Sequence, residues 1–271
     1  MKLKIIIPLL FTIHSVIIKA QAQQAMDDGK LIFEKKCTRC HGYDGTKGYL
    51  GAKNLRKSRL DDDGLFTTIT NGRWIMPSWK RKLSPQQIHA VIALYQNFKK
   101  LIMTIKKMNE LILLCTAIAT ALIAGLFYAY TCSVNIGLGR LPDRDYLAAM
   151  QAINSAILNP LFFASFMGTL LLLPLSAWLN FSDETRLRFT LLCAAAVLYM
   201  VGVFGVTIFG NVPLNDALAH IDLSKLSSTE IAGQRAAFEK PWLTYHNIRT
   251  AASVICLVLV ILSCMYKKMP A

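Results

Sequence analysis

Four long apolar stretches dominate the second half of the chain. They cover approximately residues 110–131, 158–181, 189–212 and 249–266. Each is close to the roughly 20 residues that a helix needs to cross the hydrocarbon core of a bilayer. Because a helix satisfies its own backbone hydrogen bonds, this pattern predicts four membrane-spanning helices within a membrane domain over 110–271.

Shorter helices are predicted between these spans. Residues 143–157 are predicted as a short amphipathic helix. Ser227 and Glu230 have the spacing of a capping box, which predicts a polar helix from there to Lys240. Pro241 is expected to end that helix, since a proline disfavours helical backbone at the residue before it.

The first half of the chain has helical patterns in a more polar setting. Residues 26–36 are predicted as a helix, and a serine followed by a proline predicts a second helix over 85–98. We expect Gly29 to face Leu94 or Tyr95, so that these two helices cross closely. No strand pattern is present. The sequence therefore predicts an all-α protein, with a small helical domain followed by a four-helix transmembrane bundle.

The N-terminus has the pattern of a secretory signal. Lys2 and Lys4 precede an apolar run over residues 5–18, and Ala-Gln-Ala follows at 20–22. A basic start, a short apolar core and small residues at the end predict a signal peptide over 1–22. An uncleaved N-terminal anchor is the alternative.

Charge separates the chain into two parts. Of the 271 residues, 54% are hydrophobic and 17% are charged, whereas about a quarter of a soluble domain is charged. The formal net charge is +14. Residues 23–107 hold 17 Lys and Arg against 7 Asp and Glu, and residues 108–271 hold 10 against 9. We therefore predict a basic domain over 23–100, a basic linker over 101–109 and a nearly neutral membrane domain.

The most informative string is Cys37-Thr38-Arg39-Cys40-His41. C-x-x-C-H is the attachment motif of c-type haem: two thiols bind the two vinyl groups of one porphyrin, and the adjacent histidine supplies an axial nitrogen. A zinc site needs about four ligands, but this part of the chain has no further cysteine, and its other histidine is His89. A redox C-x-x-C needs a βαβ setting, which is absent. We predict one covalently attached haem c with its iron.

Met76 is the candidate for the sixth iron ligand. It follows His41 by 35 residues and lies between two tryptophans. Pro77 stiffens its loop, and Met/His ligation leaves no open position on the iron. A core methionine is the alternative, although the other methionine of residues 23–100, Met26, precedes the haem motif.

At this point the first domain resembles a known family. Residues 26–98 are similar to a small class I cytochrome c domain. The strings that carry the resemblance are Gly29–Phe33, Cys37–Gly42, the glycine-rich loop 42–55, Asn71-Gly72, Met76-Pro77 and the closing helix 85–98. The resemblance implies an all-α haem fold and one-electron transfer to a redox partner protein. Lys53 departs from it, standing where a proline is usual.

Polar residues gather at one set of span ends in the membrane domain. Antiparallel spans would bring all of them to one face: Asn135, Gln151, Asn154, Asn159, Asn211, Asn215, Trp242, His246, Asn247 and Arg249. Polar groups at membrane depth are costly and are often functional, although capping and hydrogen bonding across the bundle are the alternative. As candidate catalytic residues we take Asn154, Asn211, Asn247 and Arg249.

This domain also resembles a family. Residues 108–266 are similar to the anthrone-oxygenase-like family of four-helix membrane proteins. The matching strings are Gly125–Ala129, Leu141–Asp143, Ala149–Asn154, Ile157–Pro160, Gly210–Asn215 and Trp242 with Asn247 and Arg249. The resemblance suggests cofactor-independent oxygenation of anthrones, a substrate that we do not carry over, because a family does not fix function.

Two functions stay open. The first is a membrane-anchored cytochrome that carries single electrons. The second is a membrane oxidoreductase or oxygenase acting on a quinone or other lipid-soluble molecule, with the haem domain as its electron outlet.

Haem attachment requires export, so we expect a multi-pass protein with a periplasmic haem domain, although the basic residues mildly favour the reverse orientation. We expect membrane lipid and an acidic redox protein as partners, and no nucleic acid. The basic residues that would attract that protein are Lys35, Lys36, Arg39, Lys80, Arg81 and Lys82.

Overall fold

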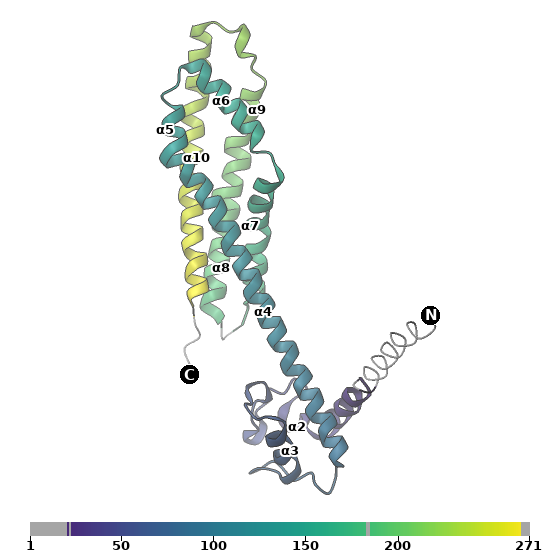
Figure 1. Cartoon of the computed structure of the whole chain (residues 1–271). Helices are drawn as coiled ribbons and strands as arrows, with labels where there is room; N and C mark the ends of the chain where they lie inside the picture. The colour runs from purple at the N-terminus through teal and green to yellow at the C-terminus, as the bar shows by residue number, and fades with distance from the viewer. Residues whose placement is uncertain (1–20, 22, 183–184, 267–271) are drawn as a thin grey trace, which may run out of the picture. The chain divides into compact units, whose positions relative to one another are not determined.

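The computed structural model describes residues 21, 23–182 and 185–266 (Figure 1). Most of these residues are helical and none forms a strand, which confirms the all-α fold class. The predicted signal peptide lies, apart from residue 21, outside the described residues. The chain divides into two compact units, Met1–Lys106 and Lys107–Ala271, and each is described by itself.

The first unit is built from short helices and the start of one long helix. Its elements are a helical segment over 23–36, α2 (Thr38–His41), 3₁₀ turns at Tyr49–Gly51 and Leu55–Lys57, α3 (Asp62–Asn71) and the beginning of α4 (Pro85–Ala129). The predicted cap of α4 is present, since the backbone N–H of Gln87 donates to Ser84 Oγ and that of Ser84 donates to Gln87 Oε1. Leu65, Ile88 and Ile92 form the buried core between α3 and α4.

Gly29 marks a close crossing between the first helical segment and α4. A Cβ atom at this position would lie 2.1 Å from the backbone oxygen of Ala90. The predicted close crossing is therefore confirmed. The predicted facing residues, Leu94 and Tyr95, are one turn too late along α4.

Helix α4 continues without a break from Pro85 to Ala129. The predicted closing helix, the basic linker and most of the first span are thus parts of one helix, and the linker is helical. A π-helical turn (Tyr130–Val134) and α5 (Asn135–Leu138) follow.

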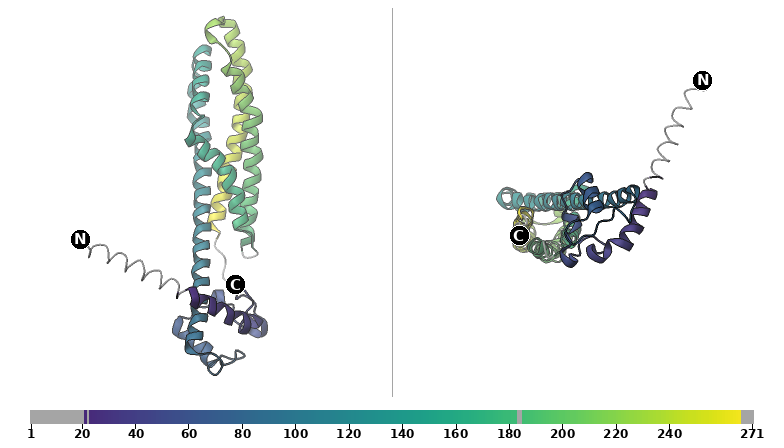
Figure 2. Two further views of the ribbon diagram at one scale, coloured as in Figure 1. Left: turned by 90° about the vertical axis from the view of Figure 1, so that its right-hand side faces the viewer. Right: turned by 90° about the horizontal axis from the view of Figure 1, so that it is seen from below.

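Four helices among the described residues are long and apolar enough to cross a membrane. They are Pro85–Leu138, Pro160–Leu179, Arg186–Ala219 and Ser228–Met265. This confirms the predicted four-helix bundle, whose second, third and fourth spans are α7 (Pro160–Leu179), α8 (Arg186–Leu198) with its continuation, and α10 (Ser228–Met265). In the second unit α8 lies beside both α7 and α10 (Figure 2). The shared core includes Ile123, Leu173, Tyr199, Cys256 and Val260.

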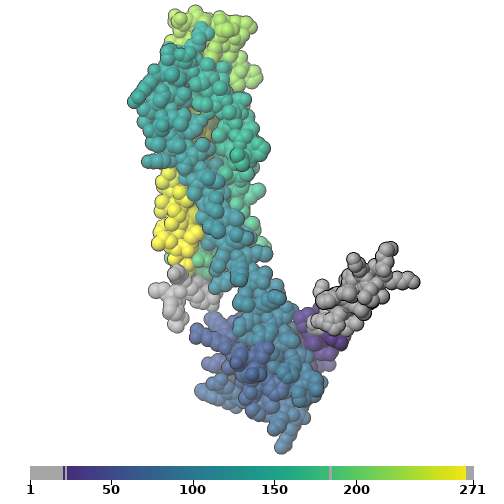
Figure 3. Space-filling view, in the orientation of Figure 1, coloured from purple at the N-terminus to yellow at the C-terminus, as the bar shows by residue number. Residues whose placement is uncertain are grey.

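A smaller core closes one end of this bundle. Helix α6 (Asp143–Ala156) and α9 (Val212–Ala219) pack there against the N-terminal part of α10. In the space-filling view the segment around α5 and α6 covers much of the visible face at this end (Figure 3). The buried side chains of this core include Leu147, Met150, Leu218, Ile231 and Trp242.

Helix α10 differs from the prediction at Pro241. The capping box of Ser227 and Glu230 is present, but the helix runs through Pro241 to Met265 instead of ending there. A proline inside a helix costs about 3 kcal/mol or more. Phe238 and Trp242, on either side of the proline, are buried in the core of this end, and burying large side chains stabilises by a comparable amount. Packing therefore outweighs the local preference.

Candidate haem site and a polar cluster in the membrane domain

Helix α2 carries the C-x-x-C-H motif on a single turn. Cys37 is its N-cap residue, and the backbone N–H groups of Cys40 and His41 both donate to the Cys37 carbonyl, at 3.2 and 3.0 Å. All three side chains are half-buried and both thiols are free. Burial, with the nearby Cys40 as a smaller cause, raises the pKa of Cys37 to about 11. The motif thus presents two thiols and an imidazole from one turn.

The His41 ring is held by the following loop. Its Nδ1 atom lies 3.1 Å from the backbone oxygen of Lys53, so Nδ1 carries the proton as donor and Nε2 is left as the free nitrogen. Partial burial lowers the pKa of His41, and the Lys53 hydrogen bond only partly opposes that. A neutral imidazole with one nitrogen anchored to a carbonyl is the form that ligates metals.

Met76 lies on a tight loop after α3. The backbone groups of Arg73 and Met76 exchange two hydrogen bonds of 3.0 Å. Gly72 has a φ of 75°, and a Cβ there would lie 2.5 Å from the Met76 oxygen. Further hydrogen bonds, from Trp79 N to Ile69 O and from Lys80 N to Thr70 O, attach the loop to α3. The loop shape is therefore fixed by its own backbone.

The residues of this unit fit a covalently attached haem. Cys37, Cys40 and His41 share one helical turn, and the hydrogen bond to Lys53 leaves the His41 Nε2 free for iron. Met76 stands on a separate loop that is attached to α3 rather than to α2. The Thr70 hydroxyl on α3 is buried without a hydrogen-bond partner, although the Thr70 carbonyl accepts from Lys80 N after the Met76 loop.

In the second unit, polar and aromatic side chains of α10 form a cluster at three- and four-residue spacing. The rings of Trp242 and His246 stack at 5.1 Å with an interplanar angle of 8°. The Arg249 guanidinium lies 4.5 Å from the Phe127 ring centroid and 5.2 Å from that of Trp242. Asn211 Nδ2 donates to the Trp242 carbonyl at 3.1 Å. We call these five residues the α10 cluster.

The structure separates the four candidate residues of the membrane domain. Asn211 and Arg249 are buried in the α10 cluster, at 0% and 8% exposure. Asn247 is exposed and outside it. Asn154 lies on α6, and its Nδ2 is buried without a partner. No hydrogen bond or ring contact among the described residues joins Asn154 to the cluster.

His246 is the residue of α10 at the centre of the cluster. It is not one of the four candidate catalytic residues, which include its neighbour Asn247 instead. Its place one turn from both Trp242 and Arg249 is the signal that could have found it. Phe127 and Thr131 belong to the first span, and nothing in the sequence around them distinguishes them from other residues of a membrane-spanning helix. Only the fold shows that Phe127 contacts Arg249 and that Thr131 Oγ1 lies 3.0 Å from His246 Nε2.

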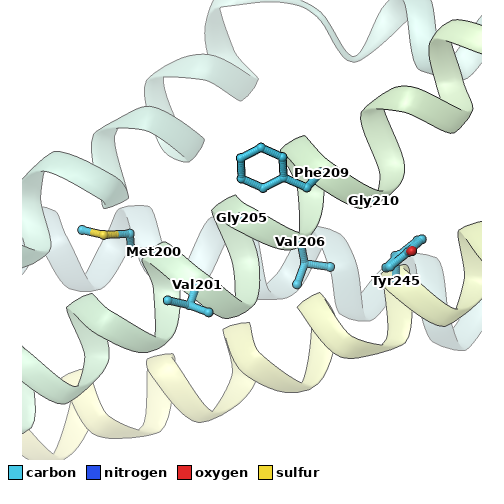
Figure 4. Close-up of a pocket in the computed structure, with 7 residues that line it drawn as sticks. All are labelled: Met200, Val201, Gly205, Val206, Phe209, Gly210 and Tyr245. Carbon is cyan, nitrogen blue, oxygen red and sulfur yellow. The ribbon is translucent and has the colours of Figure 1, made fainter.

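An apolar groove of about 480 Å³ lies on the third span (Figure 4). Its walls come from the π-helical turns Tyr199–Gly205 and Thr207–Asn211 and from Tyr245 of α10. A Cβ at Gly210 would lie 2.6 Å from the Tyr245 ring, so this glycine lets the ring lie against the helix. π-Helical turns are rare in proteins, and those that occur are often found at functional sites.

Both domains match known families. Residues 24–94 match the model of cytochrome c oxidase, cbb3-type, subunit III, and residues 160–259 match that of anthrone oxygenase. Cytochrome c6 of Leptolyngbya boryana is 38% identical over 73 residues, which cover 25% of this chain and 84% of that protein. Cytochrome c6 of Nostoc sp. is 36% identical over 73 residues, with 24% and 64% covered. The cbb3-type cytochrome c oxidase subunit FixP of Azorhizobium caulinodans is 40% identical over 73 residues, 25% of each chain.

No solved structure matches the chain. The relatives establish the class: the chain belongs to the c-type cytochromes, and a cytochrome c domain implies haem c iron and a redox partner. More particularly, it joins that domain to an anthrone-oxygenase-like domain in one multi-pass membrane protein.

Proposed function

We propose that this protein is a membrane-bound carrier of single electrons with one haem c. Cys37 and Cys40 attach the porphyrin, and His41 and Met76 ligate the iron. When bound, the haem supplies a reversible one-electron couple. The observation that supports the proposal best is the His41–Lys53 hydrogen bond inside a C-x-x-C-H motif, because it orients a free ring nitrogen.

The chain's own residues favour a carrier over a catalyst. Lys53 holds the His41 ring, and the loop that Gly72 permits fixes the backbone of Met76. Two protein ligands leave no open iron position for a substrate. The functional division that we propose is a signal peptide over 1–22, a cytochrome domain over 23–100, a linker over 101–109 and a membrane domain over 110–271.

The test of haem attachment compares two pairs of cysteines in the full chain. The variant Cys37→Ser with Cys40→Ser is expected to lose haem that survives a denaturing gel. The control is Cys115→Ser with Cys264→Ser, since both of those cysteines are exposed and outside the motif. It should keep the haem and the low-spin α band of the reduced protein. Covalent haem in the first variant, or no such band in wild type, would contradict the proposal.

We also propose that the haem domain faces the periplasm, since haem attachment of this type takes place after export. Four spans would return the C-terminus to the same side. A C-terminal alkaline phosphatase fusion is therefore expected to be active and a C-terminal green fluorescent protein fusion to be dark. The opposite result would place the haem domain in the cytoplasm.

The second candidate function is a membrane oxidoreductase whose electrons leave through the haem. The buried polar residues Asn211 and Arg249 favour it, since such groups at membrane depth are usually functional. Menadiol, a lipid-soluble quinol, would lose two electrons and two protons and pass the electrons singly to the haem. Haem reduction by menadiol should then slow in Arg249→Ala with Asn211→Ala, while reduction by ascorbate stays unchanged. Equal menadiol rates would leave the membrane domain as an anchor.

A further inference from the structure

Arg249 is a buried cation that contacts two aromatic rings but pairs with no anion among the described residues. Its side chain lies inside the bundle at 8% exposure, and its Nε atom is buried with no hydrogen-bond partner. Among the described residues its one side-chain hydrogen bond runs from Nη2 to His246 Nδ1, at 3.3 Å. No carboxylate pairs with it among residues 21, 23–182 and 185–266. A guanidinium stays protonated in proteins, and burying it without an anion is strongly unfavourable.

His246 does not compensate this charge. Because its Nδ1 accepts from Arg249, its proton lies on Nε2, which donates to Thr131 Oγ1 at 3.0 Å. Thr131 Oγ1 in turn donates to the Phe127 carbonyl at 3.2 Å. This chain of hydrogen bonds uses a neutral imidazole and is complete without a further partner.

Asn211 supplies a second unsatisfied polar atom in the same α10 cluster. The residue is fully buried, and its Nδ2 donates to the Trp242 carbonyl, but its Oδ1 has no partner. Buried polar atoms are almost always hydrogen-bonded in folded proteins. The cluster therefore leaves one charged donor and one acceptor unpaired, beside the rings of Phe127 and Trp242.

From this arrangement we infer that the α10 cluster binds a lipid-soluble acid: an apolar, aromatic molecule whose carboxylate or phenolate oxygen pairs with Arg249. The anion supplies the missing charge, and the surrounding rings suit a planar apolar body. Asn211 Oδ1 would accept from a hydroxyl group beside that oxygen. The inference is independent of the haem ligation proposed above.

In this inference the apolar body enters by the groove on the third span, whose lining does not itself include the five cluster residues. Two of its lining residues, Gly210 and Tyr245, are the chain neighbours of Asn211 and His246 (Figure 4). Because the groove is apolar, we expect the ligand to approach from the lipid rather than from water.

The test uses 2-naphthoate and its uncharged methyl ester as probes. The full chain in nanodiscs is dialysed against each probe. We expect wild type to bind the acid about tenfold or more tightly than the ester, the factor of a charge-assisted hydrogen bond. Arg249→Met should lose about the same factor for the acid and none for the ester. Arg140→Met, which removes an exposed arginine, is the matched control and should bind as wild type does.

Thermal unfolding without a probe separates a ligand site from a structural role. Arg249→Met removes a buried charge that no carboxylate pairs with and keeps an apolar side chain beside the two rings, so its unfolding temperature should equal or exceed that of wild type. Arg249→Lys keeps the charge and should keep selectivity for the acid, which leaves the inference testable if the methionine variant does not fold. Three results would each overturn it: no naphthoate binding to wild type, equal binding of acid and ester, or unchanged acid binding in Arg249→Met. An intact haem spectrum in every variant keeps this result separate from the proposed electron transfer.

Discussion

The Nδ1 atom of His41 lies 3.1 Å from the backbone oxygen of Lys53, twelve residues further along the chain. The acceptor is a main-chain carbonyl, which any residue supplies. Lys53 stands where the cytochrome family usually has a proline, and the hydrogen bond is made nonetheless. The glycine-rich loop thus positions the proposed iron ligand through its backbone, so this departure from the family pattern leaves the ligand intact.

The first prediction concerns the sixth ligand. Met76→Ala should keep covalent haem, because the thioether cysteines are unchanged, but it should open one position on the iron. The near-red absorbance band of sulfur-to-iron ligation should disappear, and the reduced protein should bind carbon monoxide. Met26→Ala is the control and should do neither. Ready binding of carbon monoxide by wild type would show that Met76 is not a ligand.

The second prediction compares two glycines with positive φ. Gly72→Ala places a Cβ 2.5 Å from the Met76 oxygen, whereas a Cβ at Gly51 meets nothing within 4 Å. Gly51→Ala should therefore cost only the backbone term of about 1–2 kcal/mol. Gly72→Ala should cost clearly more and weaken the near-red band before the domain unfolds. Denaturant titration followed by haem absorbance measures both, and equal losses would show that the Met76 loop does not depend on Gly72.

Most of the fold could be predicted from the sequence, because its signals are local. Apolar length gave the four spans, and the capping boxes at Ser84 and Ser227 marked the starts of α4 and α10. Pro241 was interpreted wrongly because the packing of Phe238 and Trp242 cannot be deduced from the residues next to a proline. The facing residue of Gly29 was misplaced by one turn for a similar reason, since a crossing point depends on two helices.

The candidate sites were predictable to different degrees. The haem motif is contiguous, so the chemistry of Cys37, Cys40 and His41 follows from their spacing alone. The α10 cluster depends on contacts between spans, and composition does not distinguish Asn211, which is buried, from Asn247, which is exposed. The contribution of Phe127 could not be foreseen, because an aromatic residue in an apolar span has no distinctive pattern.

The third prediction concerns the closed end of the bundle. Arg235 on α10 binds Asp143 at 2.9 Å and Glu239 at 2.7 Å, and its guanidinium lies 4.4 Å from the Tyr146 ring centroid. Its side chain is only 14% exposed, so Arg235→Ala leaves two carboxylates without their cation. We expect a loss of about 2–3 kcal/mol, the contribution of charged hydrogen bonds. Unfolding in detergent measures it, with Arg140→Ala as the exposed control; a loss no larger than in that control would refute the network's role.

The last prediction concerns the basic surface of the cytochrome domain. The six side chains beside the haem motif and the methionine loop are all exposed: Lys35, Lys36, Arg39, Lys80, Arg81 and Lys82. If they attract an acidic redox partner, electron transfer to the anionic oxidant ferricyanide should slow as salt is added, because the Debye length falls from about 10 Å at 0.1 M to about 3 Å at 1 M. Transfer to the cationic oxidant tris(phenanthroline)cobalt(III) should instead become faster.

Charge reversal locates the effect on the surface. Lys80→Glu with Lys82→Glu should slow ferricyanide oxidation at low salt and flatten its salt dependence. Lys99→Glu with Lys100→Glu changes the net charge equally at positions that flank neither the haem motif nor the methionine loop in sequence, and should have the smaller effect. Stopped-flow absorbance of the haem measures these rates. Rates that do not vary with salt and are equal in both variants would mean that the basic residues only keep the domain soluble, because electrostatic steering acts through the field at the site of encounter.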